Sequence, residues 1–210
     1  ISILGLTANS GVLGVLLGLY LLRLGYGPAF IGLVNAIGPF VSAASCLPAA
    51  GIGQRWGYRR TILIGLLCLV LGYGLLPLVE WVPLALQKGW ILASYLVSGM
   101  GGALYIVNIT PAMTAATTSQ DRNHVFALRI ALMPLAGFAG SLIGGLLPTL
   151  FTHTLALPPD GPASYRYAWW AGVLLSVPAL WTAWAVQRDA PPDPSVPSAS
   201  GLRMTDPSTP

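Results

Sequence analysis

Three arginines gather in one short stretch of this chain, the sequence GQRWGYRRT at residues 53–61. Arg55, Arg59 and Arg60 fall within six positions, although only 8% of all residues are charged. Arginine side chains bond the free carbonyls at helix C-termini and the phosphates of lipids. Gly57 stands between them, and glycine lets a chain turn sharply because it has no Cβ. The stretch therefore predicts a charged turn between two helices.

A second group of candidates consists of polar side chains inside apolar stretches, where they can line a substrate cavity: Asn9, Asn35, Tyr105, Asn108 and Ser141. The alternative is hydrogen bonding between helices, which contributes about 0.6 kcal/mol on average in membranes. Both interpretations stay open for each of these residues. Arg129, near the start of the fifth apolar stretch, attracts an anion in one interpretation and snorkels to the lipid headgroups in the other.

Catalytic and metal-binding patterns are weak in this sequence. Ser98 and His153 can be cast as nucleophile and base of an intramembrane protease, but Leu96 stands where a G-x-S-G motif needs glycine. Cys46 and Cys68 lack partner histidines for a metal site and are expected to be free, apolar thiols. All six acidic residues lie outside the long apolar stretches, so no proton relay is visible. We expect no enzymatic activity, no metal and no cofactor.

These candidate residues need elements that hold them in a membrane. The 210 residues are 55% hydrophobic, with a mean hydropathy of +0.72 and only ten basic and six acidic side chains. The charges leave six uncharged stretches of at least 19 residues, and about 20 apolar residues span a bilayer as a helix. The alternation of a transmembrane β-barrel is missing. We predict an all-α membrane protein with six spans, near residues 3–22, 29–50, 61–79, 90–110, 130–151 and 168–187.

The basic residues also orient these spans. Six spans place both termini on one side, together with the turns at 51–60 and 111–129. Seven of the ten Arg and Lys residues lie on that side, and the more basic side of a membrane protein faces the cytoplasm. We therefore expect both termini in the cytoplasm and the protein in a bacterial inner (plasma) membrane. The basic residues do not gather on one soluble face, so nucleic acid is not an expected partner.

The two ends of the chain differ from its middle. The chain begins with Ile1 rather than Met, and we expect it to be a fragment. Residues 189–210 hold six prolines and few apolar side chains, which predicts a disordered linker or tail after a six-helix domain at 1–188. Aromatic residues at the start of the sixth span are expected to form an interfacial belt: Tyr165, Tyr167, Trp169 and Trp170.

The arginine turn and its flanking helices resemble the major facilitator superfamily of membrane transporters. The stretch GLVNAIGPFVSAASCLPAAGIGQRWGYRRTILIG is similar to the family's second helix, first cytoplasmic turn and third helix, where the signature is G-x-x-x-D-R-x-G-R-R. Arg55, Gly57, Arg59 and Arg60 match the signature, whereas Gln54 replaces its acid. The resemblance implies that this motif clamps a cytoplasmic gate between two halves of a carrier. The alternative is a basic turn that only orients the protein.

Glycines extend this resemblance to the fifth helix. Gly14 and Gly18 on the first span, and Gly140 and Gly144 on the fifth, are spaced to let helices approach closely. The stretch that holds Gly140, Gly144 and Gly145 resembles the family's G-P-x-x-G-G motif, with Ser141 in place of the proline. These glycines are predicted to form helix-packing faces.

The resemblance covers residues 1 to about 188. It implies the amino-terminal six-helix half of a secondary active or facilitative carrier, built as two three-helix repeats of opposite orientation. It also implies alternating access to a small solute. The expected partners are the lipid bilayer and a second six-helix half, either a missing carboxy-terminal half or a second copy. A non-transporting six-helix membrane partner or truncated product and an intramembrane serine protease stay open as alternatives.

Overall fold

The computed structural model describes residues 2–118, 120–156, 158 and 161–185, except for the side chains of 2–9, 116, 179, 182, 183 and 185. The predicted tail at 189–210 lies outside this part of the chain. All regular structure in the described part is helical, which confirms the predicted all-α class. In chain order the elements are α1 (Ser2–Arg23), α2 (Pro28–Trp56), α3 (Tyr58–Leu75), the 3-10 helix η1 (Leu76–Trp81), α4 (Leu84–Ala116), α5 (Arg122–Thr154), α6 (Ala163–Leu174) and α7 (Val177–Ala185).

Four segments are long and apolar enough to cross a membrane: Pro28–Trp56, Tyr58–Trp81, Leu84–Ala115 and Arg122–Thr154. They contain the predicted second to fifth spans. The predicted first span corresponds to α1, of which Ser10–Arg23 forms a shorter apolar helix among the residues described in full. The predicted sixth span, 168–187, is wrong as one continuous helix, because two short helices, α6 and α7, occupy this stretch.

A proline explains why the sixth span is divided. Pro178 has no N–H to donate, and its ring would clash with the carbonyl four residues earlier, that of Leu174. Helix α6 ends at this residue. The chain tightens there, because the N–H of Ser176 donates to the carbonyl of Val173 at 3.0 Å instead of the one before it. Helix α7 then starts at Val177.

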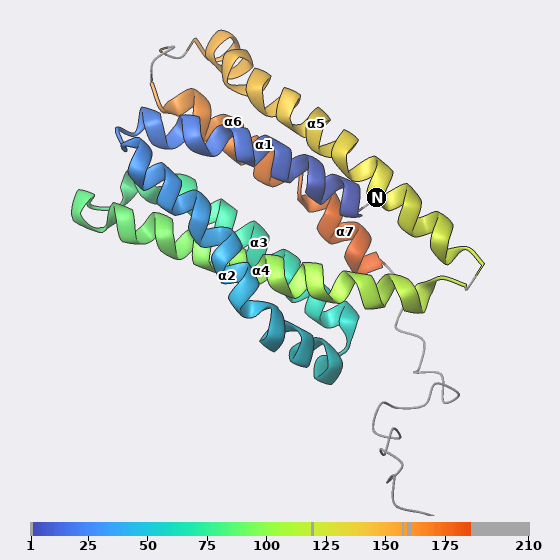
Figure 1. Ribbon diagram of the computed structural model, residues 1–210. Helices are drawn as coiled ribbons and strands as arrows, with labels where there is room; N and C mark the ends of the chain where they lie inside the picture. The colour runs from blue at the N-terminus through green and yellow to red at the C-terminus, as the bar shows by residue number, and fades with distance from the viewer. Residues whose placement is uncertain (1, 119, 157, 159–160, 186–210) are drawn as a thin grey trace, which may run out of the picture.

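The helices form two groups of three. Helices α1, α5 and α6 contact one another, and helices α2, α3 and α4 contact one another. Figure 1 shows α1 and α5 side by side on one side of the bundle, with α2 and α4 on the other. Helix α7 contacts both α1 and α3 and so joins the two groups. The first group therefore combines helices from both ends of the sequence, whereas the second consists of three consecutive helices.

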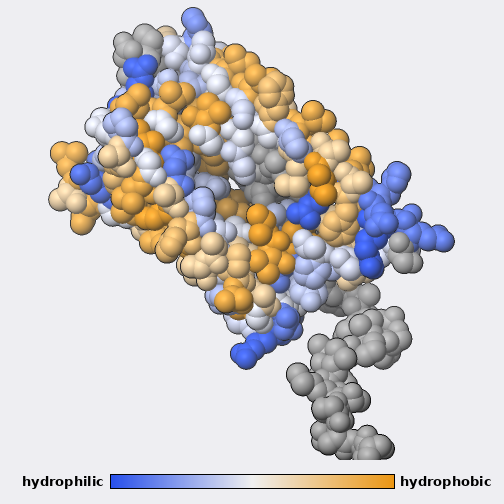
Figure 2. Space-filling view, viewed as in Figure 1, coloured by the Kyte–Doolittle hydropathy of each residue, from blue (hydrophilic) through white to orange (hydrophobic). Residues whose placement is uncertain are grey.

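The surface of the bundle is apolar along the helices and hydrophilic at their ends. In Figure 2, hydrophobic side chains cover much of α4 and α5, and hydrophilic ones gather at the α4–α5 turn and at the end of α2. The same view is hollowed between the α1–α5 pair and the α2–α4 pair. Exposed apolar side chains on α2 and α5 include Phe40, Leu47, Ile130 and Phe138. Such a surface suits contact with lipid or with another apolar surface.

Glycines bring the helix backbones into direct contact within each group. A Cβ added at Gly101 on α4 would lie 2.6 Å from the carbonyl oxygen of Gly65 on α3. One at Gly72 would lie 2.6 Å from the backbone nitrogen of Ser98. Both distances are too short for any larger residue, so α3 and α4 pack backbone against backbone.

Helices α1 and α5 also pack backbone against backbone, but only some of the predicted glycines take part in this contact. Gly144 lies at this contact, because a Cβ there would lie 2.8 Å from the Cα of Val12, and Gly140 is buried. On α1 the contact uses Gly11, which faces the carbonyl of Gly137. Within the described part of the chain, nothing lies within 4 Å of a Cβ added at the other three predicted glycines, so they make no such contact here: Gly14, Gly18 and Gly145.

The largest buried side chain, Trp169 of α6, lies in the main apolar core with residues of α1 and η1. Its indole N–H donates to the carbonyl of Tyr73 at 2.8 Å, and its ring packs against Tyr20 at a centroid distance of 6.2 Å. Trp169 was predicted to lie in an interfacial belt and is fully buried instead. A buried indole needs an acceptor, and the end of α3 supplies it.

We expect Gly101→Ala to destabilise the protein by about 1–3 kcal/mol, because the added methyl group overpacks the α3–α4 contact. The measurement is SDS-induced unfolding in mixed micelles. Gly89→Ala, in the exposed first part of the same helix, is the matched control. Nothing lies within 4 Å of a Cβ at Gly89, so this change should be neutral or stabilise by up to about 1 kcal/mol. Equal effects of the two substitutions would contradict the backbone contact.

Candidate functional site

The predicted arginine turn is present and sharp. Helix α2 ends at Trp56 and α3 begins at Tyr58, so Gly57 alone joins them. Its φ of 86° lies in the region that residues with a Cβ avoid. The N–H of Gly57 donates to the carbonyl of Gly53 at 3.0 Å, and the hydroxyl of Thr61 donates to the carbonyl of Gly57 at 3.0 Å. We call this end of the bundle the arginine end.

Arg59 connects the arginine turn to the divided sixth span. Its Nη2 atom donates to the carbonyl oxygen of Trp184, near the end of α7, at 2.6 Å. A cation at a helix C-terminus satisfies a free carbonyl and suits the helix dipole. The Nε atom of Arg59 is buried and has no acceptor among the described residues. Gln54, Arg55 and Arg60 are exposed.

Asn108 joins two helices of one group. The side chain is 1% exposed, and its Nδ2 atom donates to the carbonyl of Ala49 on α2 at 3.1 Å and to that of Leu104 at 2.9 Å. Its Oδ1 atom fills the space beside Gly53 that a Cβ would otherwise occupy. The structure therefore gives Asn108 a hydrogen bond between helices.

The other predicted cavity residues are not brought together. Asn35 is exposed and donates to the carbonyl of Ile31 in its own helix, and Ser141 donates to that of Gly137 in its own helix. The side chain of Asn9 lies outside the described residues. Tyr105 is 5% exposed, and its hydroxyl has no hydrogen-bond partner in the described part of the chain. Among the described candidates, only Tyr105 keeps a buried polar atom available.

Arg129 points inward rather than to the headgroups alone. This half-buried residue of α5 reaches α4, where its Nη1 atom lies 3.7 Å from the sulfur of Met113. Arg129 and Met113 belong to different helix groups, so this contact crosses the boundary between the groups.

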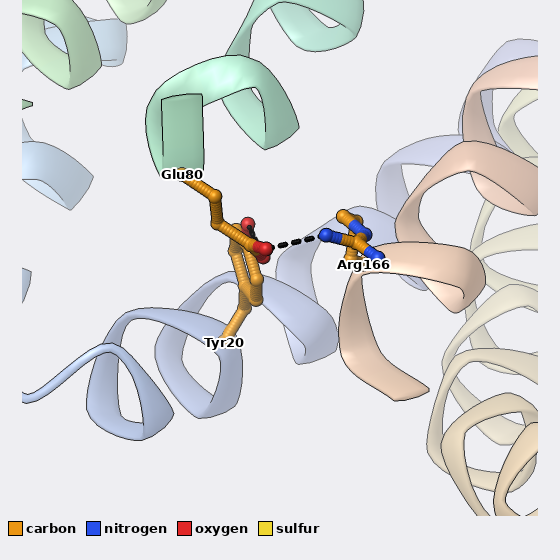
Figure 3. A network of polar contacts seen from close by, with 3 residues as sticks. All are labelled: Tyr20, Glu80 and Arg166. Carbon is orange, nitrogen blue, oxygen red and sulfur yellow. Dashed lines mark hydrogen bonds and ion pairs between the residues drawn. The ribbon is translucent and has the colours of Figure 1, made fainter. Parts of the chain in front are cut away.

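A network of three side chains at the opposite end was not predicted. The hydroxyl of Tyr20 donates to Oε1 of Glu80 at 2.8 Å, and Nη1 of Arg166 lies 2.5 Å from Oε2 of the same carboxylate (Figure 3). The Arg166 and Glu80 side chains are only 22% and 19% exposed. Arg166 also lies over the rings of Trp81 and Tyr167, at 5.7 and 5.2 Å from their centroids. We call this the Glu80 end.

This network fixes three elements and keeps its charges. Tyr20 belongs to α1, Glu80 to η1 and Arg166 to α6, so one carboxylate joins both helix groups. Burial acts to lower the pKa of Arg166, but its hydrogen bond with Tyr167 and the charge and hydrogen bond of Glu80 outweigh this and raise that pKa. Arg166 therefore stays a cation. Glu80 follows the predicted span 61–79 and Arg166 precedes the predicted span 168–187, at ends that lie on the same side of the membrane, and this was the available signal.

Residues considered for catalysis or metal binding have structural contacts. Ser98 is buried and donates to the carbonyl of Tyr95 at 3.0 Å, within its own helix. Cys46 and Cys68 are free thiols. In the described residues, no group of three or more His, Cys, Asp or Glu side chains is arranged to hold a metal ion.

Long apolar helices, charged turns at their ends and glycine contacts between them are features of an integral membrane protein. A family model described as Major Facilitator Superfamily matches residues 1–207. The chain belongs to the major facilitator superfamily, which confirms the resemblance in its sequence.

Curated relatives are multidrug resistance proteins named MdtH. Those of Yersinia pestis (strain Pestoides F) and Yersinia pseudotuberculosis serotype O:1b (strain IP 31758) are 24% identical over 164 residues. The match covers 77% of this chain and 36% of each relative. The chain thus matches about a third of the length of these relatives.

We expect a double-mutant cycle to show that Glu80 and Arg166 act as a pair. Glu80→Gln and Arg166→Gln each leave a half-buried charge without its partner, so the double variant should lose less stability than the sum of the single ones. The coupling should fall within about 0.5–3 kcal/mol in SDS-induced unfolding. The control pairs Glu80→Gln with Lys88→Gln, an exposed cation at the same end. Additive effects in both cycles would contradict the pairing.

Proposed function

We propose that this chain is one six-helix half of a carrier that moves a small solute across a membrane by alternating access. Membership of the major facilitator superfamily supports a membrane transporter. The observation that carries the finer proposal is the division of the helices into two groups of three.

The two groups correspond to each other in the way that an inverted repeat requires. In such a repeat, α1 is equivalent to α4, α2 to α5, and α3 to the α6–α7 pair. Exchanging each helix of the group α1, α5 and α6 for its equivalent then gives α4, α2 and α3, which is the other group. The contact of α1 with α5 then corresponds to that of α4 with α2, and both contacts occur. Repeats related in this way place a binding site at their interface near the middle of the membrane.

A second six-helix half is the partner that we propose. Helices α2 and α5 are far less buried than α3 and α4, and they flank the hollowed face in Figure 2. Gly14 and Gly18 on α1 have free space around them, which would let another helix approach. The match to 36% of each relative supports a chain that is part of a larger carrier.

We further propose that the arginine end and both termini lie in the cytoplasm of a bacterium, because most basic residues lie on that side. In this orientation Tyr105 and Arg129 line the cytoplasmic part of the cavity wall. The relatives are named as multidrug resistance proteins, which supports small organic molecules as the substrates.

The transport proposal is tested with two preparations in liposomes: residues 1–210 alone, and the product of the complete coding region. Uptake of labelled organic cations, organic anions and sugars is compared with that of empty vesicles. We expect saturable uptake only by the product of the complete coding region, because alternating access needs one half to move against the other. Saturable uptake by residues 1–210 would favour a homodimeric carrier, and no saturable uptake by either preparation would favour a non-transporting membrane protein.

In the gate that we propose, Arg59 holds α7 against the bundle. We expect Arg59→Gln to release the end of α7. Loss of one exposed charge-assisted bond costs about 1 kcal/mol, which corresponds to an about fivefold larger population of the released helix end. A single cysteine at position 180, with Cys46 and Cys68 replaced by alanine, should then react about fivefold faster with a membrane-permeant maleimide. Arg55→Gln is the control and should leave this rate unchanged. An unchanged rate in Arg59→Gln would favour a turn that only orients the protein.

A further inference from the structure

An apolar groove lies between α3 and α7, the short helix that a turn separates from α6. Its volume is about 510 Å³, and it is lined by two leucines of α3 and four residues of α7: Leu63, Leu67, Val177, Leu180, Trp181 and Trp184. Trp181 and Trp184 are 69% and 64% exposed, and their rings lie 6.2 Å apart. No charged side chain lines the groove. Its walls therefore suit an apolar chain.

Positive charge stands at one end of this groove. Residues three and four apart lie on the same face of a helix, so Arg59 and Arg60 precede Leu63 by one turn on the face of α3 that lines the groove. Arg59 marks the end of the groove directly, because it binds the carbonyl of Trp184. Arg60 is exposed, and the described part of the chain shows no hydrogen bond or ion pair for it.

In the described part of the chain, neither acidic side chain is paired with these arginines. Of the two acidic side chains among the described residues, Glu80 binds Arg166 and Asp121 accepts from Thr118. Glu80 lies at the other end of the bundle, since η1 follows the far end of α3. The Nε atom of Arg59 is buried and has no acceptor among the described residues. The arginine end of the groove is thus prepared for an anion.

We propose that this groove binds an anionic phospholipid, with one acyl chain between α3 and α7 and the phosphate held by Arg60 beside Arg59. A guanidinium presents several N–H donors to a phosphate in a matching geometry. A phospholipid combines an apolar chain with a negative head at one end, which is the combination that this groove presents. The exposed tryptophans suit the boundary between chains and headgroups. This site stands whether or not the protein transports a solute.

The lipid would also fasten α7. This helix is separated from α6 by the turn at Leu175 and Ser176, and at its far end Arg59 donates a hydrogen bond to the carbonyl of Trp184. A chain in the groove fills the space beneath Trp181 and Trp184 and links α7 to α3 by apolar contacts. The lipid therefore acts as a packing element for the divided span.

The test uses nanodiscs that contain the purified full chain and a phospholipid brominated on its acyl chains, because bromine quenches nearby tryptophans. Brominated phosphatidylglycerol and brominated phosphatidylcholine with the same chains are compared as minor components of an unbrominated phosphatidylcholine bilayer. Quenching at the groove is measured as the part of the total tryptophan quenching that disappears when Trp181 and Trp184 are replaced by phenylalanine. One arginine near the surface contributes about 1 kcal/mol toward an anionic lipid, so phosphatidylglycerol should quench at about a fivefold lower mole fraction.

Substitutions separate the groove from the general surface charge. Arg60→Gln should abolish the fivefold preference, Arg60→Lys should retain part of it, and Leu67→Trp should weaken quenching by both lipids because it fills the groove. Arg55→Gln, in the same turn but on α2, should leave the preference unchanged. Equal quenching by the two lipids in the unchanged protein, or equal losses in Arg60→Gln and Arg55→Gln, would overturn the proposal. Absence of quenching at Trp181 and Trp184 by either lipid would also overturn it, since protein would then cover the groove.

Discussion

Direct contact between helix backbones is the constraint on which this structure depends. Lipid is as apolar as leucine, so burying apolar surface gives helices little reason to associate inside a bilayer, and close packing has to do it. Here the contacts occur where glycines remove the side chain from the interface, as between Gly65 and Gly101 or at Gly144 against Val12. These helix faces therefore accept no side chain. The resulting frame is rigid and holds its charged groups only at the ends.

Those charged ends serve one element above all. Helix α3 and its extension η1 provide a group for each end of the divided sixth span: Arg59 binds the carbonyl of Trp184 at one end, and Glu80 binds Arg166 at the other. Between these attachments lies the interruption at Leu175 and Ser176. The part of the bundle with the weakest backbone continuity is thus held by two charge-assisted interactions rather than by helix hydrogen bonds.

Sequence predicted the class, the arginine turn and six spans, four of which correspond to membrane-length helices, because these follow from composition and local spacing. It did not predict the features that depend on how the helices pack against one another. A proline divides the sixth span, yet Pro39 and Pro134 lie inside unbroken helices, so the residue type alone did not decide. The four-residue spacing favoured Gly14 and Gly18, but which face of a helix meets another is fixed by packing, and the contact uses Gly11. Trp169 stood among aromatic residues at a helix start and is buried because Tyr73 offers an acceptor.

The distance along the chain between Glu80 and Arg166 has a consequence for biosynthesis. The two residues are 86 positions apart, and ribosomes add roughly 5–20 residues per second. Glu80 therefore waits on the order of 4–17 s after its own synthesis before its partner exists. During this time α4 and α5 are inserted into the membrane while the Glu80 carboxylate is still hydrated. A nascent chain that ends before Arg166 therefore holds the Glu80 carboxylate without its partner.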